Sequence, residues 1–121
     1  MEKPNLIVDL SFEFALSLIK LYKELVENRE FVISKQLLKS GTSVGANIEE
    51  AVAAQSRKDF ISKMSIALKE ARETRYWLRL LDRSQLVKQN YKEYLSKIDS
   101  IINVLVKIIK SSKNGKNDDA L

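Results

Sequence analysis

The sequence predicts an all-α protein, an antiparallel up-down-up-down bundle of four helices, and three observations lead to this prediction. Apolar residues recur at steps of three and four along four segments, which is the period of an amphipathic helix. The 121 residues include only three Gly and one Pro, so few residues interrupt a helix. The connections between the four segments are short, which leaves consecutive helices little choice but to run antiparallel.

The first helix is predicted from Asp9 to Glu27, and Pro4 lies outside its periodic segment. Its apolar surface is wide, which predicts burial on more than one side. One face holds Leu18, Leu21, Tyr22 and Leu25, and the surface extends sideways through Phe12, Leu16 and Ile19. Asn28 and Arg29 are predicted to form the turn that follows.

The second helix is predicted from Phe31 to Gln55, with Gly41 and Gly45 four residues apart within it. A glycine in a helix interior costs about 1 kcal/mol relative to alanine. Small residues at this spacing let another helix approach closely, and this is the predicted role of the pair. The alternative is a kink, with Thr42 or Ser43 capping a second half-helix.

The third helix has the clearest pattern. Ser56 and Asp59 approximate a capping box at its start. An apolar or small stripe follows at unbroken steps of four and three, the spacing of helices that pack at a shallow angle. Its members are Phe60, Met64, Ala67, Ala71, Thr74, Leu78 and Leu81.

The fourth helix repeats this logic, with Asn90 as its cap and Glu93 three residues later. Its predicted core stripe holds Tyr91, Leu95, Ile98, Ile102, Leu105 and Ile109. The chain is long enough for one domain, so residues 1–110 are predicted to form the bundle. Residues 111–121 are polar, contain Gly115 and are predicted to form a flexible C-terminal tail.

Composition excludes several classes of function. Without Cys there is no thiolate chemistry, and without His the commonest general base and metal ligand are both missing. We therefore expect no enzymatic activity, no metal and no cofactor. Carboxylates that could face one another are expected instead to form ion pairs with Arg72 or Arg75; they are Glu49, Glu50, Glu70 and Glu73. No signal peptide or membrane span is evident, so a cytoplasmic protein is expected.

Charge is unevenly distributed along the chain. The net charge is +5, yet residues 9–28 hold two basic and four acidic groups, whereas residues 56–84 hold eight basic and four acidic groups. The second half is thus the basic half, which favours anionic partners.

Two surfaces on the third helix are left over after the core stripe is assigned. Ile66, Trp77 and Leu80 fall roughly opposite that stripe and are predicted to form an oligomer interface; the alternative is that Trp77 packs sideways on a helix of its own chain. A second row could bind phosphates and stack on a base, although such a row can equally be a solvated face. It consists of Arg72, Tyr76, Arg79 and Arg83, with Lys88 and Lys92 as an extension.

Residues 40–51 read SGTSVGANIEEA, residues 56–61 read SRKDFI and residues 67–81 read ALKEARETRYWLRLL. These three ordered blocks closely resemble the bacterial four-helix bundle family, also called the 23S ribosomal RNA intervening-sequence protein family. The resemblance covers nearly all of residues 9–110.

This resemblance implies antiparallel bundles that assemble into ring-shaped homopentamers. A relative, the accessory protein of diversity-generating retroelements, is a basic pentamer that binds nucleic acid and a reverse transcriptase, although a net charge of +5 is modest for such a role. By resemblance, two sets of residues are packing and interface positions rather than an active site. They are Gly41, Ser43, Gly45, Asn47, Ile48 and Glu50, and Ala67, Glu70, Ala71, Glu73, Thr74 and Leu78.

Three functions remain open from the sequence. The first is a non-enzymatic homo-oligomeric scaffold that engages RNA, DNA or a nucleic-acid-handling protein. The second is an assembly module that binds only protein partners. The third, and least favoured, is an enzyme that uses carboxylate, Lys or Arg groups in a cleft between subunits.

Overall fold

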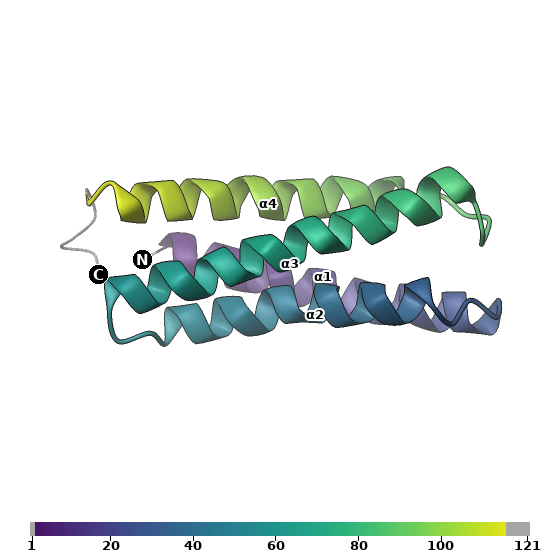
Figure 1. Ribbon diagram of the computed structural model, residues 1–121, viewed down its shortest axis with the longest axis horizontal. Helices are drawn as coiled ribbons and strands as arrows, with labels where there is room; N and C mark the ends of the chain where they lie inside the picture. The colour runs from purple at the N-terminus through teal and green to yellow at the C-terminus, as the bar shows by residue number, and fades with distance from the viewer. Residues whose placement is uncertain (1, 116–121) are drawn as a thin grey trace.

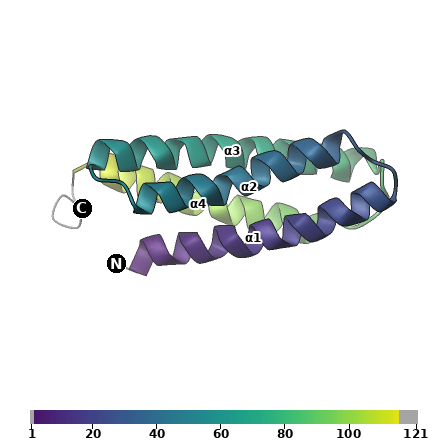
Figure 2. The ribbon, with the colours of Figure 1, turned by 90° about the horizontal axis from the view of Figure 1, so that it is seen from below.

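The computed structural model describes the backbone of residues 2–115 and the side chains of residues 6–115. Its helices are α1 (Glu2–Glu27), α2 (Ile33–Val52), α3 (Arg57–Ser84) and α4 (Lys92–Lys113). Each helix packs beside the one before it, and α4 also contacts α1. Consecutive helices run in opposite directions along the elongated molecule (Figure 1, Figure 2). The predicted all-α up-down-up-down bundle is confirmed.

The core stripe predicted for α3 is confirmed. All of its members are buried except Phe60, which is partly buried against the core. The small residues Ala67 and Ala71 are fully buried in this stripe, and α3 shares the most extensive contact in the bundle with α2. The hydroxyl groups of Ser40 on α2 and Thr74 on α3 are hydrogen-bonded at 2.9 Å inside the core. This buried pair fixes the register of α2 against α3.

At the start of both α3 and α4, a polar side chain accepts a hydrogen bond from a backbone N–H group of the first turn. Ser56 Oγ accepts a hydrogen bond from the Asp59 backbone N–H at 3.1 Å, which confirms the predicted cap of α3. Asn90 Oδ1 accepts from the Lys92 backbone N–H at 2.9 Å at the start of α4.

The start of α2 is held by Glu30, a side chain that no periodic pattern in the sequence marks. Glu30 lies in the connection after α1 and is only 7% exposed. Its carboxylate accepts hydrogen bonds from the backbone N–H groups of Val32, Ile33 and Ser34, at 3.1, 2.9 and 2.6 Å. The Ser34 hydroxyl donates back to the Glu30 carbonyl oxygen at 2.7 Å. A negative charge at this position is also attracted to the positive end of the helix dipole and stabilises the helix.

Helix boundaries differ from the prediction in three helices. α1 begins at Glu2 rather than Asp9, and Pro4 lies in its first turn, where a helix needs no backbone donor. α2 is shorter at both ends than the predicted 31–55. α4 continues to Lys113, so the first residues assigned to the tail are helical, and Ser112 is buried. Residues 116–121 of the predicted tail lie outside the described residues.

Two core predictions need correction. In α4 the residue buried between Ile98 and Leu105 is Ile101, whereas Leu95 and Ile102 are only partly buried. In α1 the sideways extension of the apolar surface is not buried within the chain. Phe12, Leu16 and Ile19 remain 56%, 48% and 44% exposed because the core already takes the opposite face of α1.

Tyr91, which precedes α4, is the largest fully buried side chain. Its hydroxyl donates to the Val87 carbonyl oxygen at 2.7 Å. Burial raises the pKa of Tyr91, and it likewise raises the pKa of Tyr94 on α4. Tyr91 is therefore a neutral phenol, and its burial together with its hydrogen bond to Val87 anchors the α3–α4 connection to the core.

The two glycines of α2 lie in one uninterrupted helix, rather than in the two half-helices of the alternative interpretation. Gly41 is closely packed, whereas Gly45 is not. They face α1 but differ in the space around them. A Cβ at Gly41 would overlap Leu18 Cδ1, which is fully buried. A Cβ at Gly45 would lie 3.5 Å from Ser11 Oγ and 3.6 Å from the Ser11 carbonyl oxygen, which is ordinary contact.

Alanine substitutions at these two glycines are expected to have opposite effects. Gly45→Ala should stabilise the fold by up to about 1 kcal/mol because alanine is the better helix former. Gly41→Ala gains the same amount but forces Leu18 out of place, and overpacking of this kind costs about 1–3 kcal/mol. Denaturation at one protein concentration should thus rank Gly45→Ala above the unchanged chain and Gly41→Ala below it. An increase in stability for both variants would show that α1 can shift away from Gly41.

Candidate nucleic-acid interface

The face of α3 opposite the core carries a second, wholly exposed row of side chains. Its members repeat at steps of four and three along the helix, the same spacing as the core stripe. We call this row the outer seam; it consists of Lys58, Ser62, Ser65, Lys69, Arg72, Tyr76, Arg79 and Arg83. It spans 25 residue steps, or about 37 Å of helix. No Asp or Glu belongs to it.

The cations of the outer seam are displayed rather than paired. Among the side chains of residues 6–115, none of the seam's Lys or Arg residues forms an ion pair. Arg75, an arginine of α3 outside the seam, does form an ion pair: its Nε lies 2.7 Å from Asp99 Oδ1 on α4. Arg75 points toward α4 and is not a member of the seam. Its ion pair therefore neutralises none of the seam's cations.

Tyr76 is the aromatic member of the outer seam and is about half exposed. Its ring centroid lies 5.1 Å from that of Trp77, with an interplanar angle of 70°, so the two rings meet edge to face. The Trp77 Nε1–H donates to Glu73 Oε2 at 3.2 Å. Trp77 is itself partly buried against the core, so it braces Tyr76 from within the chain.

The predicted extension of the Arg row leaves α3. Lys88 lies in the α3–α4 connection and Lys92 is the first residue of α4, and both are exposed. Both lie at the end of the bundle where α3 ends, which is also the end of the seam that carries Arg83 (Figure 1). Lys58 and Lys69 instead extend the row toward the opposite end of α3. Continuing the steps of four and three backward from Arg72 in the sequence would have found both.

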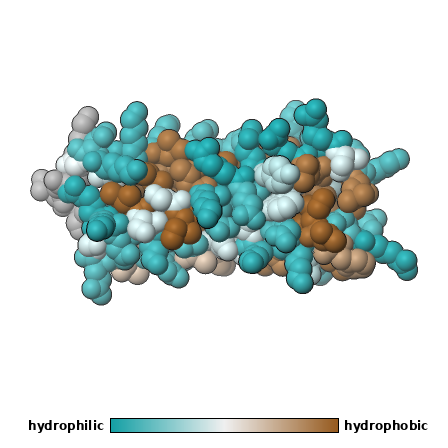
Figure 3. All heavy atoms as spheres, in the orientation of Figure 1, coloured by the Kyte–Doolittle hydropathy of each residue, from teal (hydrophilic) through white to brown (hydrophobic). Residues whose placement is uncertain are grey.

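The predicted oligomer interface on α3 lies beside the outer seam. Ile66 is exposed, while Leu80 and Trp77 are partly buried. The contact of Trp77 with the core is the packing that the alternative interpretation anticipated, although its outer surface remains accessible. Figure 3 shows hydrophilic side chains over much of the face that carries α3, with hydrophobic side chains in two separate regions.

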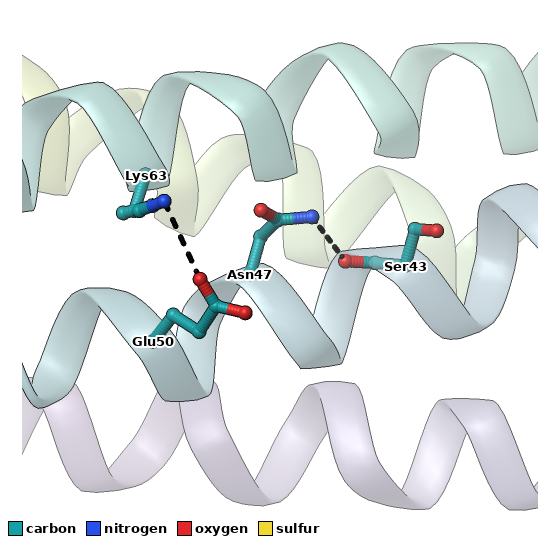
Figure 4. A network of polar contacts seen from close by, with 4 residues as sticks. All are labelled: Ser43, Asn47, Glu50 and Lys63. Carbon is teal, nitrogen blue, oxygen red and sulfur yellow. Dashed lines mark hydrogen bonds and ion pairs between the residues drawn. The ribbon is translucent and has the colours of Figure 1, made fainter.

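The block of α2 that carries the family resemblance contributes local polar contacts. Asn47 Nδ2 donates to the Ser43 carbonyl oxygen at 2.8 Å, and Glu50 lies 3.4 Å from Lys63 Nζ on α3 (Figure 4). The predicted partners of the carboxylates were therefore wrong: Glu50 pairs with Lys63, and Arg75 pairs with Asp99. These exposed pairs contribute little to stability.

A hollow opens at each end of the bundle. One, of about 540 Å³, lies between the start of α3 and the end of α4 and is lined by Arg57, Lys58, Ile61, Ser112 and Lys113. The other, of about 240 Å³, lies between the two connections at the opposite end of the bundle. Among its lining residues the one carboxylate is Glu30, which caps α2. The described residues hold no cluster of three potential metal ligands, and no described helix is long and apolar enough to cross a membrane.

Comparison with known proteins identifies relatives of the chain. Residues 3–107 match the family described as 23S rRNA-intervening sequence protein. None of the curated proteins matches the chain. A crystal structure from Bacteroides thetaiotaomicron VPI-5482, described as a protein with unknown function from the S23 ribosomal protein family, is 53% identical. The match covers 89% of this chain and 98% of that one, with a TM-score of 0.85. The chain therefore belongs to the 23S rRNA-intervening sequence protein family.

Proposed function

We propose that the protein is a non-enzymatic, homo-oligomeric scaffold of the cytoplasm that binds nucleic acid through the outer seam of α3. The observation that carries this proposal is the row of exposed cations that contains no Asp or Glu and forms no ion pair within residues 6–115. Phosphate groups bind Arg and Lys in this arrangement, and Ser and Tyr hydroxyls between the cations can donate further hydrogen bonds to them. A solvated face would more often intersperse both signs of charge.

Self-assembly is the second part of the proposal. The exposed side chains of Phe12, Leu16 and Ile19 form an apolar stripe along α1, on the side that faces away from the core. A second copy of the chain that covered this stripe would remove a substantial apolar surface from water. The family resemblance implies a pentamer, and a closed ring places the α3 seams of all copies in one symmetric array.

The proposal predicts salt-sensitive binding that depends on the seam. The triple variant Arg72→Ala, Arg79→Ala, Arg83→Ala should weaken binding to a short RNA or DNA about tenfold to a hundredfold at about 100 mM salt. The slope of log affinity against log salt should become shallower by roughly two to three, because each lost phosphate contact contributes about 0.7 to 0.9. Fluorescence anisotropy measures both quantities.

A matched control separates the seam from the total charge. Lys35→Ala, Lys39→Ala, Lys107→Ala removes three exposed cations from α2 and α4, and it should change affinity less than threefold on the same salt-dependent scale. Equal losses for both triples would mean that net charge, rather than the seam, attracts nucleic acid. If the unchanged protein retains no RNA or DNA at about 50 mM salt, the nucleic-acid function is wrong.

One observation favours the protein-only alternative. The three most exposed large apolar side chains, Phe31, Val32 and Leu86, all line the hollow between the two connections at one end of the bundle. Such a surface can receive an apolar side chain of a protein partner. A partner that is captured by the unchanged protein, survives nuclease treatment and is lost with Phe31→Ser, Leu86→Ser would support this function.

A further inference from the structure

Tyr76 offers a flat ring surface in the middle of a row of cations. In the edge-to-face arrangement with Trp77, the indole covers at most one face of the phenol ring. The bond from Trp77 to Glu73 and the contact of Trp77 with the core limit the movement of the indole. The Tyr76 ring is therefore held in place before any ligand arrives, which lowers the entropy that binding would lose.

Arg72 and Arg79 flank this ring along the seam, four residues before and three residues after it. Residues at these separations lie next to each other on a helix, with Cβ atoms about 5–6 Å apart. Neither guanidinium forms an ion pair within residues 6–115, so both are available to an anion. The seam thus places a cation, a braced aromatic ring and a second cation in line.

This order of groups matches a single strand better than a duplex. A single strand presents both phosphates and unstacked bases, so a base can stack on an aromatic side chain while cations hold its backbone. In a duplex the base faces are stacked inside the helix, so no base could stack on Tyr76, and the seam could reach only phosphates and base edges in a groove.

Resting on the proposed function, we propose that the preferred ligand of the outer seam is single-stranded nucleic acid. One of its bases stacks on Tyr76, and Arg72 and Arg79 hold the phosphates on either side. RNA and DNA share this chemistry, because neither stacking on Tyr76 nor phosphate contact with Arg72 and Arg79 requires a 2′-hydroxyl.

The full-length protein is tested against four probes of one sequence, about 16 nucleotides long: single-stranded RNA, single-stranded DNA and the two corresponding duplexes. At about 100 mM salt, at least one single strand should bind about tenfold more tightly than its duplex. Tyr76→Ala should weaken single-strand binding about tenfold and leave duplex binding unchanged, whereas Tyr76→Phe, which keeps the ring, should stay within about twofold. Circular dichroism and the assembly mass confirm that both variants fold.

Trp77 provides a second readout because it is the one Trp of the chain. A base stacked on Tyr76 lies near the indole, so saturation with a single strand should change the Trp77 emission, and duplex should not. This change should be absent in Tyr76→Ala even at saturating concentration.

The outcomes distinguish this inference from the function on which it rests. If no probe binds at about 50 mM salt, both are wrong. If duplex binds as tightly as single strand and Tyr76→Ala changes neither affinity, no base stacks on Tyr76, and the seam contacts phosphates or base edges instead. In that case the single-strand inference is wrong and the proposed nucleic-acid function stands.

Discussion

Replacing Glu30 with Ala is expected to lower the free energy of unfolding by about 3 kcal/mol. The carboxylate holds three backbone N–H groups at the start of α2, and bonds to a charged acceptor are the stronger kind. Loss of a simple helix cap costs about 1 kcal/mol, and each donor left unsatisfied near the core adds to this. Denaturation by urea at a fixed protein concentration measures the change.

Two further variants identify the cause. Glu27→Ala removes the same charge only three residues earlier, but Glu27 is exposed in the last turn of α1, and its loss should change stability by less than about 0.5 kcal/mol. Glu30→Gln keeps the shape and one acceptor oxygen, so it should fall between Glu30→Ala and the unchanged chain. If Glu30→Ala unfolds like Glu27→Ala, water has replaced the carboxylate at the helix start.

Replacing the three apolar residues of the α1 stripe with Gln, a polar residue that forms helices well, is expected to dissociate the assembly. The triple variant Phe12→Gln, Leu16→Gln, Ile19→Gln should run as a monomer of close to 13.9 kDa in light scattering. The unchanged chain should form a larger species, about 70 kDa if the assembly is a pentamer. Helix content should not change, because these side chains lie outside the core.

The control for this experiment removes apolar side chains elsewhere. Val52→Gln, Leu86→Gln, Val106→Gln replaces three exposed residues of α2, the α3–α4 connection and α4, and should leave the mass unchanged. If the α1 variant keeps the mass of the unchanged chain, the interface lies elsewhere, and Trp77→Ala then tests the surface predicted from the sequence. A monomeric unchanged chain at about 100 μM would contradict self-assembly altogether.

Periodicity was enough to predict the fold because nearly every core residue sits at helical spacing. The stripe of α3 from Met64 to Leu81 is buried as predicted, and Ser56 caps the helix as its spacing to Asp59 indicates. The boundaries of α1 and α2 were harder to predict because side-chain contacts decide them. Pro4 does not prevent an earlier start of α1, and Glu30 reaches forward to the backbone in a way that no periodic pattern records.

The candidate site was predictable in part. The row from Arg72 to Arg83 follows from spacing alone, and the structure adds that its cations are unpaired within residues 6–115. The brace between Tyr76 and Trp77 could not be predicted, because adjacent residues on a helix point in different directions and only their rotamers bring the rings together.

The two rows of α3 share no residue, and this separation bears on how such a protein can change over time. Substitutions in the exposed row alter stability by only about 0.5 kcal/mol. Selection on them therefore depends on any ligand of that surface and hardly on whether the chain folds. The buried row is close-packed, so a change of even one methylene group there affects stability, and this constraint keeps the fold the same. A helix arranged in this way can acquire a different ligand by successive single replacements, each of which leaves a folded protein behind.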